Sequence, residues 1–390
     1  MALPLLSYNL KSLAVRWQIT LLAVFGVGVV VAVFVILHAM AAGFAETLKA
    51  TGRADGAIVV QKGAQSEPAS IFPREQADVL AAGAGVARAA DGALLASPEV
   101  VVVVTLPGRG EEAPVNATVR GITPVASRVR GGIRLVAGRA PAEGAPELMI
   151  GQRLSRRLGG LGPGDTVRLQ GRDWRVTGVF AAEGGAFESE LWAPLDVVSQ
   201  DFQRQGQVTT LAVRLAGADA LPALERAIAA DPRLRLEARR EDRFYEAQSG
   251  AVTTPLRALA AFVVVVMGLG AVFAAMNTMN AVIAARVREV ATLRALGFGR
   301  LAILTGFLVE SAALGLAGGV VGCLLALPVN GFTGATGNTA GFAEVAWAFR
   351  VTLSGLGAGL AAALLIGAIG GLLPAIRAAR TPLSAALRTT

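Results

Sequence analysis

The sequence predicts a membrane protein with four transmembrane α-helices and a large two-lobed α+β exterior domain between helices 1 and 2. Of its 390 residues, 54% are hydrophobic and 16% are charged, a balance too apolar for a soluble domain and too charged for a chain embedded throughout. Four apolar segments are each long enough for a bilayer, which takes about 20 helical residues to cross. The remaining large segment, residues 45–254, alternates between strand and helix patterns.

The four predicted transmembrane helices are residues 18–44, 255–285, 301–329 and 351–375. Small residues near the end of the first resemble a signal-peptide cleavage site, but its uncharged run exceeds the apolar core of a signal peptide, about 7–15 residues. We therefore interpret it as an uncleaved anchor. The second helix is longer than a bilayer requires, and we expect it to tilt or to protrude into the cytoplasm.

The arginines predict the orientation of the chain. Basic residues without acids occupy its two ends, 1–17 and 376–390, and four arginines against one glutamate occupy 286–300, whereas 330–350 carries one charge of each sign. Since cytoplasmic segments concentrate Lys and Arg, we expect a cytoplasmic N-terminal amphipathic helix, a cytoplasmic tail and an exterior loop at 330–350. Both termini are then cytoplasmic, in a multi-pass protein of the bacterial cytoplasmic (inner) membrane.

Within 45–254, both ends follow strand–helix–strand order. The first end reads GAIVVQKG, FPREQADVLAA and EVVVVTL, and the last reads VTTLAVRL, ALPALERAIAADP and RLRLEARR. This weak internal repeat predicts that the chain enters one lobe, leaves for a second and returns. Between the two ends, residues of about 123–193 are rich in glycine and turns and predict a mostly β insert, with two short strands that meet at Gly171.

The sequence lacks the residues for most site chemistry, and we expect no catalytic residues and no cofactor. It has no Gly-x-x-x-x-Gly-Lys-Ser/Thr loop, so we expect no ATP hydrolysis by the chain itself. His38 is the only histidine and Cys323 the only cysteine, so we expect neither a metal site nor an intrachain disulfide. Glu188 and Glu190 follow a Gly-Gly pair, and we interpret them as a solvated loop. The net charge of +8 comes without a basic, aromatic-rich run, which argues against a nucleic-acid partner.

Polar and small residues within the predicted helices are candidates for function or packing. Glu310 lies within the third helix, where a carboxylate is expensive to bury. It could sense protons or contact substrate; alternatively, it bonds to neighbouring helices or lies near the inner interface. Asn277 and Asn280 in the second helix suit interhelical hydrogen bonds. Four glycines fit close helix packing: Gly315, Gly318, Gly319 and Gly322.

The segment RVREVATLRALGFGR, residues 286–300, is predicted to be a helix between the second and third spans. It consists of good helix formers up to Leu296, and Gly297 is a natural stop. Val290 and Ala291 share one side, whereas Leu293 and Leu296 point elsewhere. Apolar residues on more than one side suit a helix held between the membrane domain and a soluble partner. The alternative is a basic turn at the membrane interface, whose arginines reflect only the excess of Lys and Arg in cytoplasmic segments.

The sequence of residues 277–322 resembles the FtsX/MacB-type permeases of ABC transporters. That family carries Arg-x-x-Glu-(Ile/Val)-x-x-Leu-(Arg/Lys)-x-(Leu/Ile)-Gly after its second span. The residues that meet this pattern are Arg286, Glu289, Val290, Leu293, Arg294, Leu296 and Gly297. The segment from GITPV to VTGVF is similar to the MacB-type exterior domain, and LLPAIRAARTPLSAALR is similar to the family's C-terminal end, so the resemblance covers nearly the whole chain.

The resemblance implies that 286–300 is a coupling helix for an ABC ATPase subunit. We expect no fused ATPase domain, so ATP would be bound by that partner, and two permease chains, identical or paralogous, would pair with two ATPase chains. Mechanotransmission to the exterior domain would then export or handle substrate at the outer face of the membrane. A periplasmic adaptor or substrate-carrier protein and membrane lipid are further implied partners. Substrate and transport direction stay open.

Two other classes of function remain alternatives. An ATPase-independent membrane receptor or scaffold would bind a ligand through its exterior lobes and use 286–300 to dock a different cytoplasmic protein. A membrane-embedded enzyme would need a catalytic cluster that the sequence does not indicate. Co-purification with an ATPase separates the first alternative from a permease.

Overall fold

The computed structural model describes residues 17–83, 85–108, 114–217, 219–337 and 344–380. These residues form two compact units. Within the described residues, the membrane unit comprises 17–42, 255–332 and 349–380, and the α+β unit comprises 43–254 and 333–348. The predicted N-terminal helix up to residue 16 and the tail from residue 381 lie outside the described residues.

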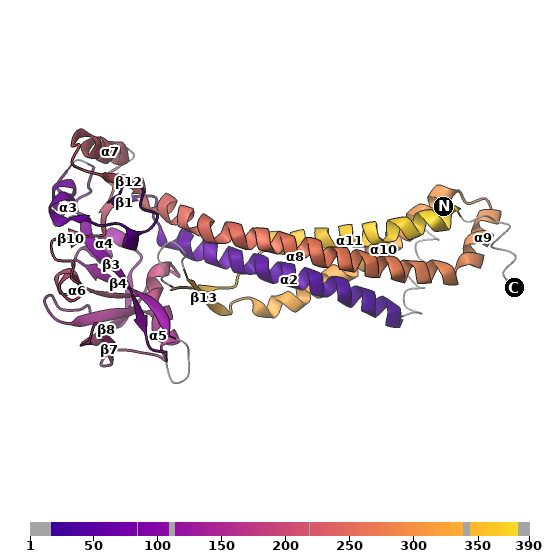
Figure 1. Cartoon of the computed structure of the whole chain (residues 1–390), viewed down its shortest axis with the longest axis horizontal. Helices are drawn as coiled ribbons and strands as arrows, with labels where there is room; N and C mark the ends of the chain where they lie inside the picture. The colour runs from indigo at the N-terminus through magenta and orange to yellow at the C-terminus, as the bar shows by residue number, and fades with distance from the viewer. Residues whose placement is uncertain (1–16, 84, 109–113, 218, 338–343, 381–390) are drawn as a thin grey trace. The chain divides into compact units, whose positions relative to one another are not determined.

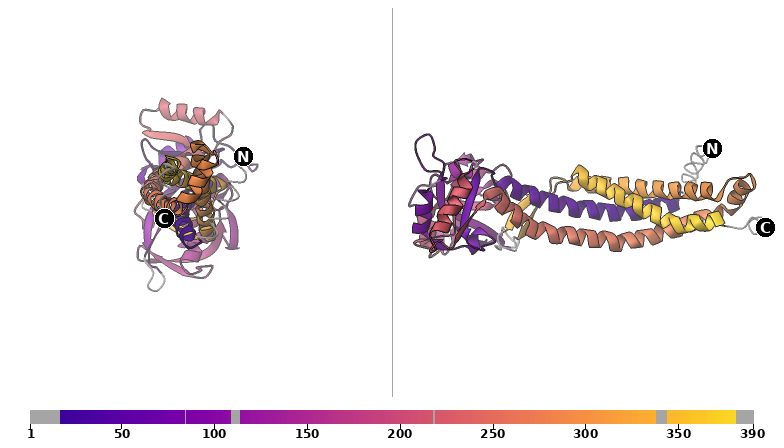
Figure 2. Two further views of the ribbon diagram at one scale, coloured as in Figure 1. Left: turned by 90° about the vertical axis from the view of Figure 1, so that its right-hand side faces the viewer. Right: turned by 90° about the horizontal axis from the view of Figure 1, so that it is seen from above.

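The membrane unit is helical. Its helices are α9 (Val287–Ala295), α10 (Arg300–Ala326), the 3-10 helix η3 (Leu327–Val329), α11 (Leu353–Arg380) and most of α2 (Trp17–Thr51) and α8 (Glu241–Ala285). The end of α2 from residue 43 and the start of α8 up to residue 254 belong to the α+β unit. Four helices of the described chain are long and apolar enough to cross a membrane: α2, α8, α10 with η3, and α11. Large apolar side chains such as Phe262 and Leu269 on α8 are exposed, as lipid contact requires. Within this unit, α10 packs beside α11 (Figures 1 and 2).

The helices are longer than the predicted spans. α2 continues past residue 44 to Thr51, α8 begins at Glu241 instead of 255, and α11 continues past 375 to Arg380. Hydropathy marks where the apolar residues end, but helical hydrogen bonding continues into polar residues that are themselves good helix formers. Pro255 does not end the helix, because α8 runs through it. At these three points the helices extend beyond the predicted spans, whose boundaries stay predictions.

The α+β unit is built on a ten-stranded sheet in the order β12-β1-β11-β3-β4-β9-β6-β8-β5, with β7 paired to β8. Its strands are β1 (Gly56–Gln61), β3 (Ala96–Leu106), β4 (Val115–Ile122), β5 (Arg134–Gly138), β6 (Glu147–Gly151), β7 (Thr166–Leu169), β8 (Arg172–Ala181), β9 (Glu190–Pro194), β11 (Thr210–Arg214) and β12 (Leu236–Arg240). A separate ribbon pairs β2 (Phe72–Pro73) with β10 (Gln207–Val208). β7 and β8 meet at Gly171, whose φ of 80° suits glycine.

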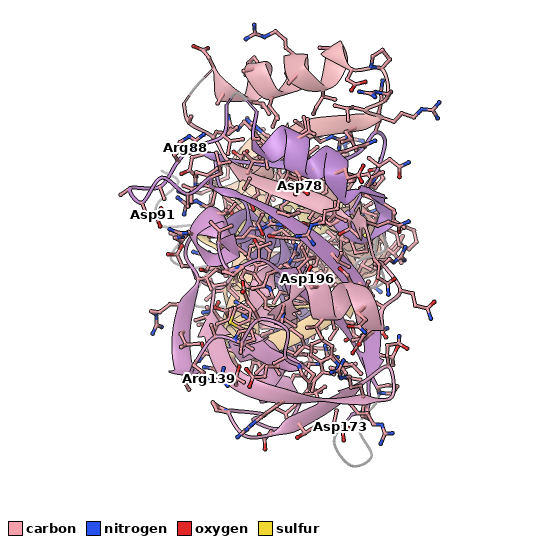
Figure 3. All side chains as sticks on the ribbon, turned by 90° about the vertical axis from the view of Figure 1, so that its left-hand side faces the viewer. Asp78, Arg88, Asp91, Arg139, Asp173 and Asp196 are labelled. Atoms are coloured by element: carbon pink, nitrogen blue, oxygen red, sulfur yellow. The ribbon has the colours of Figure 1, made fainter. Side chains whose placement is uncertain are left out.

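Short helices cover this sheet. They are η1 (Glu67–Ala69), α3 (Arg74–Ala81), α4 (Ala126–Arg130), α5 (Gln152–Arg157), η2 (Ala186–Ser189), α6 (Leu195–Asp201) and α7 (Ala220–Ala230). In α7, Leu224 and Ile228 are buried four residues apart and therefore lie on one face. Charged side chains such as Arg88, Asp91, Arg139 and Asp173 lie at the periphery of the unit (Figure 3).

Two hydrophobic cores divide the α+β unit. One includes Val59, Leu80 and Leu224 and joins β1, β11 and β12 to α3 and α7. The other includes Val119 and Trp174 and joins β4, β6, β8 and β9 to α5 and α6. The strand β3 serves both, because its first residues pair with β11 and its later residues with β4.

The predicted insert at 123–193 is therefore too short. The second core begins with Val100 on β3 and ends with Val198 on α6. β3 is one continuous strand, so no turn marks the point at which the chain enters the second core; its residues Ala-Ser-Pro-Glu pair with β11, and the valine run that follows pairs with β4.

The segment predicted as an exterior loop at 330–350 contains a β-hairpin. β13 (Thr333–Gly337) pairs with β14 (Glu344–Ala348), and both belong to the α+β unit. The backbone N–H of Ala346 donates to Ser189 Oγ at 3.0 Å, and its carbonyl accepts from Arg153 Nη1 at 2.8 Å. Glu344 accepts a hydrogen bond from the backbone N–H of Asn116 at 3.2 Å and forms an ion pair with Arg157. The first strand escaped prediction because two of its five residues are glycines, which are depleted in strands.

Candidate functional site

The helix α9 buries one face and exposes the other. Val290 and Ala291 are 6% and 3% exposed, and Val290 packs in a core cluster of the membrane unit. Leu293 and Arg294 are half-buried. Leu296 is 73% exposed, although it is a large apolar residue. The outward face of α9, which we define as Arg288, Glu289, Thr292, Ala295 and Leu296, is exposed throughout.

α9 ends with the hydrogen-bond pattern that is typical of a helix terminated by glycine. The N–H of Phe298 donates to the carbonyl of Leu293 at 3.1 Å, and the N–H of Gly297 donates to that of Arg294 at 3.1 Å. Gly297 has a φ of 93°, which L-residues with a side chain rarely adopt. The chain therefore reverses at this point and enters α10 at Arg300.

Arg286 faces away from the outward face of α9. It is 6% exposed, and its Nη1 donates to Glu310 Oε2 at 3.1 Å and to Oε1 at 3.3 Å. Glu310, on α10, is only 2% exposed. These contacts match the alternative in which Glu310 bonds to a neighbouring part of the membrane unit. The partner, Arg286, is the first residue of the family pattern. Within the described chain, the structure brings these two residues together although 24 positions separate them.

The two asparagines of α8 are not brought into such contacts. Asn277 is exposed and Asn280 is half-buried. In the part of the chain that the structure describes, neither side chain has a hydrogen bond to another helix, so their predicted role stays a prediction.

The four predicted glycines of α10 face two different helices. Gly315 and Gly319 lie against α11, and Gly318 and Gly322 lie against α2. A Cβ added at Gly315 would lie 2.4 Å from a carbonyl oxygen of α11, and one added at Gly322 would lie 2.4 Å from a carbonyl oxygen of α2. Because side chains cannot occupy these positions without moving a backbone, glycine allows α10 to approach both neighbours closely.

Two family models match the chain. One, described as the MacB-like periplasmic core domain, matches residues 19–231, more than half of the sequence. The other, described as the FtsX-like permease C-terminal, matches residues 261–383. The chain belongs to the FtsX/MacB permease family.

Curated relatives agree with this membership, which confirms the resemblance that the sequence indicated. The permease is 28% identical over 256 residues to the macrolide export ATP-binding/permease protein MacB of Bordetella avium, covering 60% of this chain and 38% of MacB. It is 34% identical over 137 residues to the uncharacterized ABC transporter permease YknZ of Bacillus subtilis, covering 35% of this chain and 32% of YknZ. It is 30% identical over 258 residues to the pyoverdine export ATP-binding/permease protein PvdT of Pseudomonas entomophila, covering 61% of this chain and 37% of PvdT.

The permease thus spans about a third of the length of each of these relatives. Family membership and the four apolar helices identify it as a bacterial inner-membrane protein of the ABC transporter permease class.

The α+β unit of the permease contains a buried cluster of charged side chains. Two arginines and four glutamates, each at most 7% exposed, form it: Arg120, Arg130, Glu67, Glu99, Glu190 and Glu241. They come from β4, α4, η1, β3, β9 and the first turn of α8. The cluster therefore joins strands of both hydrophobic cores to the start of α8.

Arg120 binds three of the glutamates. Its Nε and Nη2 donate to the two oxygens of Glu190 at 2.7 and 2.8 Å, and its Nη1 donates to Glu67 at 2.9 Å and to Glu99 at 2.7 Å. Such two-point contacts between guanidinium and carboxylate groups are strong and directional. The indole N–H of Trp192 also donates to Glu190, at 2.7 Å.

Arg130 completes the cluster. Its Nη2 donates to Glu99 at 2.6 Å and to Glu67 at 2.9 Å, and its Nη1 donates to Glu241 at 2.7 Å. Both guanidinium groups lie over the ring of Phe187, 5.1 and 5.2 Å from its centroid, where the ring face attracts cations. The cluster thus satisfies its charges within the fold.

Two acids of the cluster have pKa values shifted in opposite directions. Burial alone would raise the pKa of Glu67, but the guanidinium groups of Arg120 and Arg130 lower it from 4.5 to about 2. Burial raises the pKa of Glu241, against the opposing effect of Arg130. Glu241 accepts from one arginine, whereas Glu67 accepts from two, so less guanidinium charge opposes the effect of burial on the pKa of Glu241.

The prediction that Glu188 and Glu190 form a solvated loop is wrong. Both are 7% exposed. Glu190 belongs to the buried cluster, and Glu188 accepts from the backbone N–H groups of Ala182 and Gly184 at 2.9 and 3.0 Å and pairs with Arg153 at 3.2 Å. The glycine pair before them makes a tight, packed turn, and sequence alone does not distinguish such a turn from a solvated one.

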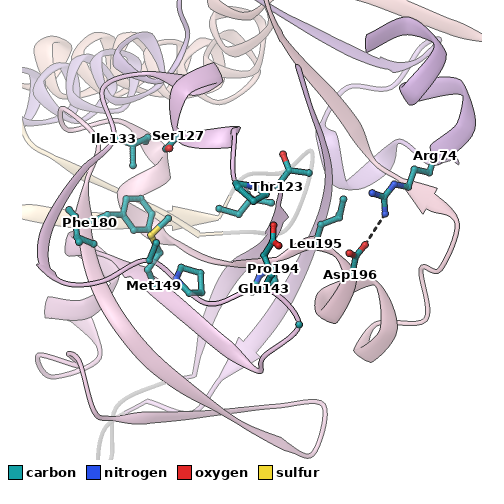
Figure 4. A pocket seen from close by; sticks show the side chains of 16 residues that line it. Arg74, Thr123, Ser127, Ile133, Glu143, Met149, Phe180, Pro194, Leu195 and Asp196 are labelled. Carbon is teal, nitrogen blue, oxygen red and sulfur yellow. Dashed lines mark hydrogen bonds and ion pairs between the residues drawn. The ribbon is translucent and has the colours of Figure 1, made fainter. Parts of the chain in front are cut away.

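A cavity of about 530 Å³ opens in the α+β unit beside β5 (Figure 4). Ile133, Met149 and Phe180 form its apolar part, and at one end Arg74 pairs with Asp196 at 2.8 Å. Thr123, Ser127 and Glu143 also line the cavity, so its surface combines polar and apolar parts. Among the described residues, no group of three His, Cys, Asp or Glu side chains is placed to hold a metal ion.

Sequence analysis missed the charged cluster, although one signal was present. Arg120 stands in the middle of the apolar strand sequence VNATVRGI, and a charged residue at a core position of a strand needs a buried partner. The partners themselves could not be identified, because they lie as many as 70 positions away along the sequence and meet only in the folded unit.

Proposed function

We propose that this chain is the permease subunit of an ABC transporter, driven by ATP hydrolysis on a separate ATPase subunit that docks on α9. The division of α9 into two faces carries this proposal. Its inner face is fixed in the membrane unit by Val290 and Ala291, whereas its outward face exposes Leu296 together with charged residues. An exposed large apolar side chain within a charged rim is typical of a protein-binding surface.

The relatives support the choice of an ATPase as the partner. MacB and PvdT are each named as ATP-binding/permease proteins, and YknZ is named as an ABC transporter permease. The present sequence has no Gly-x-x-x-x-Gly-Lys-Ser/Thr loop with which to bind ATP phosphates. In this proposal, Glu289, Leu293, Arg294 and Leu296 contact the ATPase, whereas Arg286 and Val290 hold α9 in place.

The proposal extends to topology and to the site of action. Arg377 and Arg380 lie in the last turn of α11 and, with the arginines around α9, favour a cytoplasmic location for both. The α+β unit would then lie outside, where it would export or mechanically handle substrate, alone or with a periplasmic adaptor or carrier protein. Two permease chains would form the working unit. Macrolides and pyoverdine are cargoes of the named relatives, and the chemistry of the present cargo is open.

Affinity purification from native membranes tests the proposal, followed by an ATPase assay. Wild-type chain should recover an ATPase in stoichiometric amount. Leu296→Asp should lower the recovery at least about tenfold, because a buried charge at the centre of an interface costs more than 1.4 kcal/mol. The matched control is Val79→Asp, which changes an equally exposed apolar residue on α3.

Equal ATPase recovery with Leu296→Asp and with wild type would remove α9 as the docking site. Recovery of a folded chain without any ATPase would favour the receptor or scaffold alternative.

A further inference from the structure

Two acids contact Arg286 in different environments. Glu310 on α10 is 2% exposed, and both of its oxygens accept from Nη1 of the arginine, at 3.1 and 3.3 Å. Glu289 on α9 lies 3.5 Å from Nε, but its side chain is 47% exposed. Water screens the contact with Glu289, so the contact with Glu310 is the one that fixes the guanidinium group.

Arg286 occupies the junction between α8 and α9. Its φ of −114° and ψ of 14° are not helical, and it is the N-cap of α9. Its own N–H donates to the carbonyl of Ile283 at the end of α8, at 2.9 Å, and its carbonyl accepts from Val290 in the first turn of α9, at 3.0 Å. The direction of this side chain is therefore linked to the direction in which α9 leaves α8.

The surroundings of the pair make its separation unfavourable. The pair lies beside the core cluster of the membrane unit that contains Val290. The other apolar side chains of this cluster include Met279 and Val282 on α8, and Ile303 and Phe307 on α10. A carboxylate or guanidinium group left alone among such residues would lose both its partner and its water. A movement of α9 that opened the pair would expose two buried charges, so α9 and α10 should move together.

We propose that Glu310 is the positioning residue of the coupling helix: through Arg286 it fixes the start of α9 to α10, so that force applied to α9 enters the third membrane helix. This inference rests on the proposed docking of an ATPase at α9. It separates the family pattern into two parts, because Arg286 is directed inward to the membrane unit whereas Glu289 and Leu296 are directed outward. It also gives the acid within the third span a mechanical role in place of proton sensing or contact with substrate.

Hydrogen–deuterium exchange on the full chain in lipid nanodiscs tests the anchoring without any ATPase. Glu310→Gln keeps the shape of the side chain and removes its charge, and it should raise the amide exchange rates of Val287–Ala295 by about tenfold, since local opening becomes easier. The matched control is Glu289→Gln, the same chemical change beside the same arginine but at an exposed position, which should leave these rates unchanged. The exchanged pair Arg286→Glu with Glu310→Arg should restore slow exchange.

A second measurement, on the chain with its ATPase, distinguishes positioning from general stability. Glu310→Gln should retain ATPase recovery and hydrolysis. In wild type, the amide exchange rates of α10 should differ between the nucleotide-free and the ATP-bound state, and in Glu310→Gln this difference should be roughly tenfold smaller. An effect of this size is typical of coupling through packed side chains. Glu310→Asp, which keeps the charge, should retain most of that change.

Three results would overturn the proposal: unchanged α9 exchange in Glu310→Gln, an equal effect of Glu289→Gln, or no recovery by the exchanged pair. Failure of the docking assignment would appear differently, as the absence of an ATPase from wild-type preparations while the exchange differences in the chain alone remain.

Discussion

In the α+β unit, two arginines lie among four glutamates inside the fold, whereas the described part of the membrane unit buries the pair Arg286–Glu310 beside α9. Arg120 alone contacts three glutamates, so the loss of one contact leaves the others in place. Arg286 has one buried acidic partner. The first arrangement joins many elements into one body, and the second links a single helix junction to a single neighbour.

The two units also differ in what holds their helices and strands together. The α+β unit combines its charged cluster with two apolar cores. In the membrane unit, α10 instead packs its glycines against α2 and α11 at distances that no side chain could occupy. Removal of a buried charge should therefore destabilise the α+β unit more than the membrane unit. Addition of a methyl group at a glycine should destabilise the membrane unit more than the α+β unit.

The largest effect is expected for Arg120→Met. It leaves Glu67, Glu99 and Glu190 with fewer cationic partners in a buried site, which should lower the free energy of unfolding by about 3–5 kcal/mol. The fluorescence of buried Trp174 and Trp192 reports unfolding of this unit in urea. The control is Arg172→Met, which breaks a half-exposed pair with Asp201 and should cost less than about 1 kcal/mol. Equal losses in the two variants would show that the cluster contributes no more than a surface ion pair.

An intermediate effect is expected for Gly315→Ala. The added methyl group would meet the backbone of α11, and overpacking of this kind costs about 1–3 kcal/mol. Cys323, the sole cysteine, lies half-buried on α10, so its reaction rate with a thiol reagent on heating measures the opening of this packing. Gly270→Ala on α8 is the control, because a Cβ there meets nothing within 4 Å; it should leave the rate unchanged or lower it. Similar rates in both variants would argue against close packing of α10 and α11.

A third comparison concerns pH. Glu67 has a folded pKa of about 2 and an ordinary value of 4.5, so its stabilisation is present above pH 4.5 and is lost as the pH falls from 4.5 to about 2. Glu241 has a raised pKa, so its contribution has the opposite sign and is lost as the pH rises through its folded pKa. In wild type, the free energy of unfolding should fall as the pH falls below 4.5. Glu67→Gln should reduce this slope by up to about 1.4 kcal/mol per pH unit, and Glu241→Gln should not. Parallel acid profiles for both variants would contradict the division of pKa values within the cluster.

The sequence predicted the periodic features of the fold. The strands β7 and β8 on either side of Gly171, the helix α7 and the four apolar helices all follow from spacing and composition within short windows. It did not predict where β3 passes from one core to the other, because the passage lies inside one strand, between Glu99 and Val100, and not at a turn. Nor did it predict the hairpin β13–β14, whose second strand is held by contacts to Ser189 and Arg153 far away in the sequence.

The candidate site was predictable only in part. The family pattern located α9, and the position of an acid in an apolar span singled out Glu310. The pairing of that acid with Arg286 depends on how α10 returns past the junction of α8 and α9, which no local pattern contains. The same reason explains the error at Glu190, whose partner Arg120 lies 70 positions earlier.

A photo-crosslinking amino acid at position 292, on the outward face of α9, tests the central claim most directly. In native membranes, irradiation should attach this position to a protein that carries a nucleotide-binding Gly-x-x-x-x-Gly-Lys-Ser/Thr loop, and the same group at exposed Ala274 on α8 should not. An adduct with an ATPase at 292 alone would establish α9 as the docking helix of a transporter. Adducts only with proteins that lack this loop, or none at all in membranes that contain the folded chain, would contradict the account.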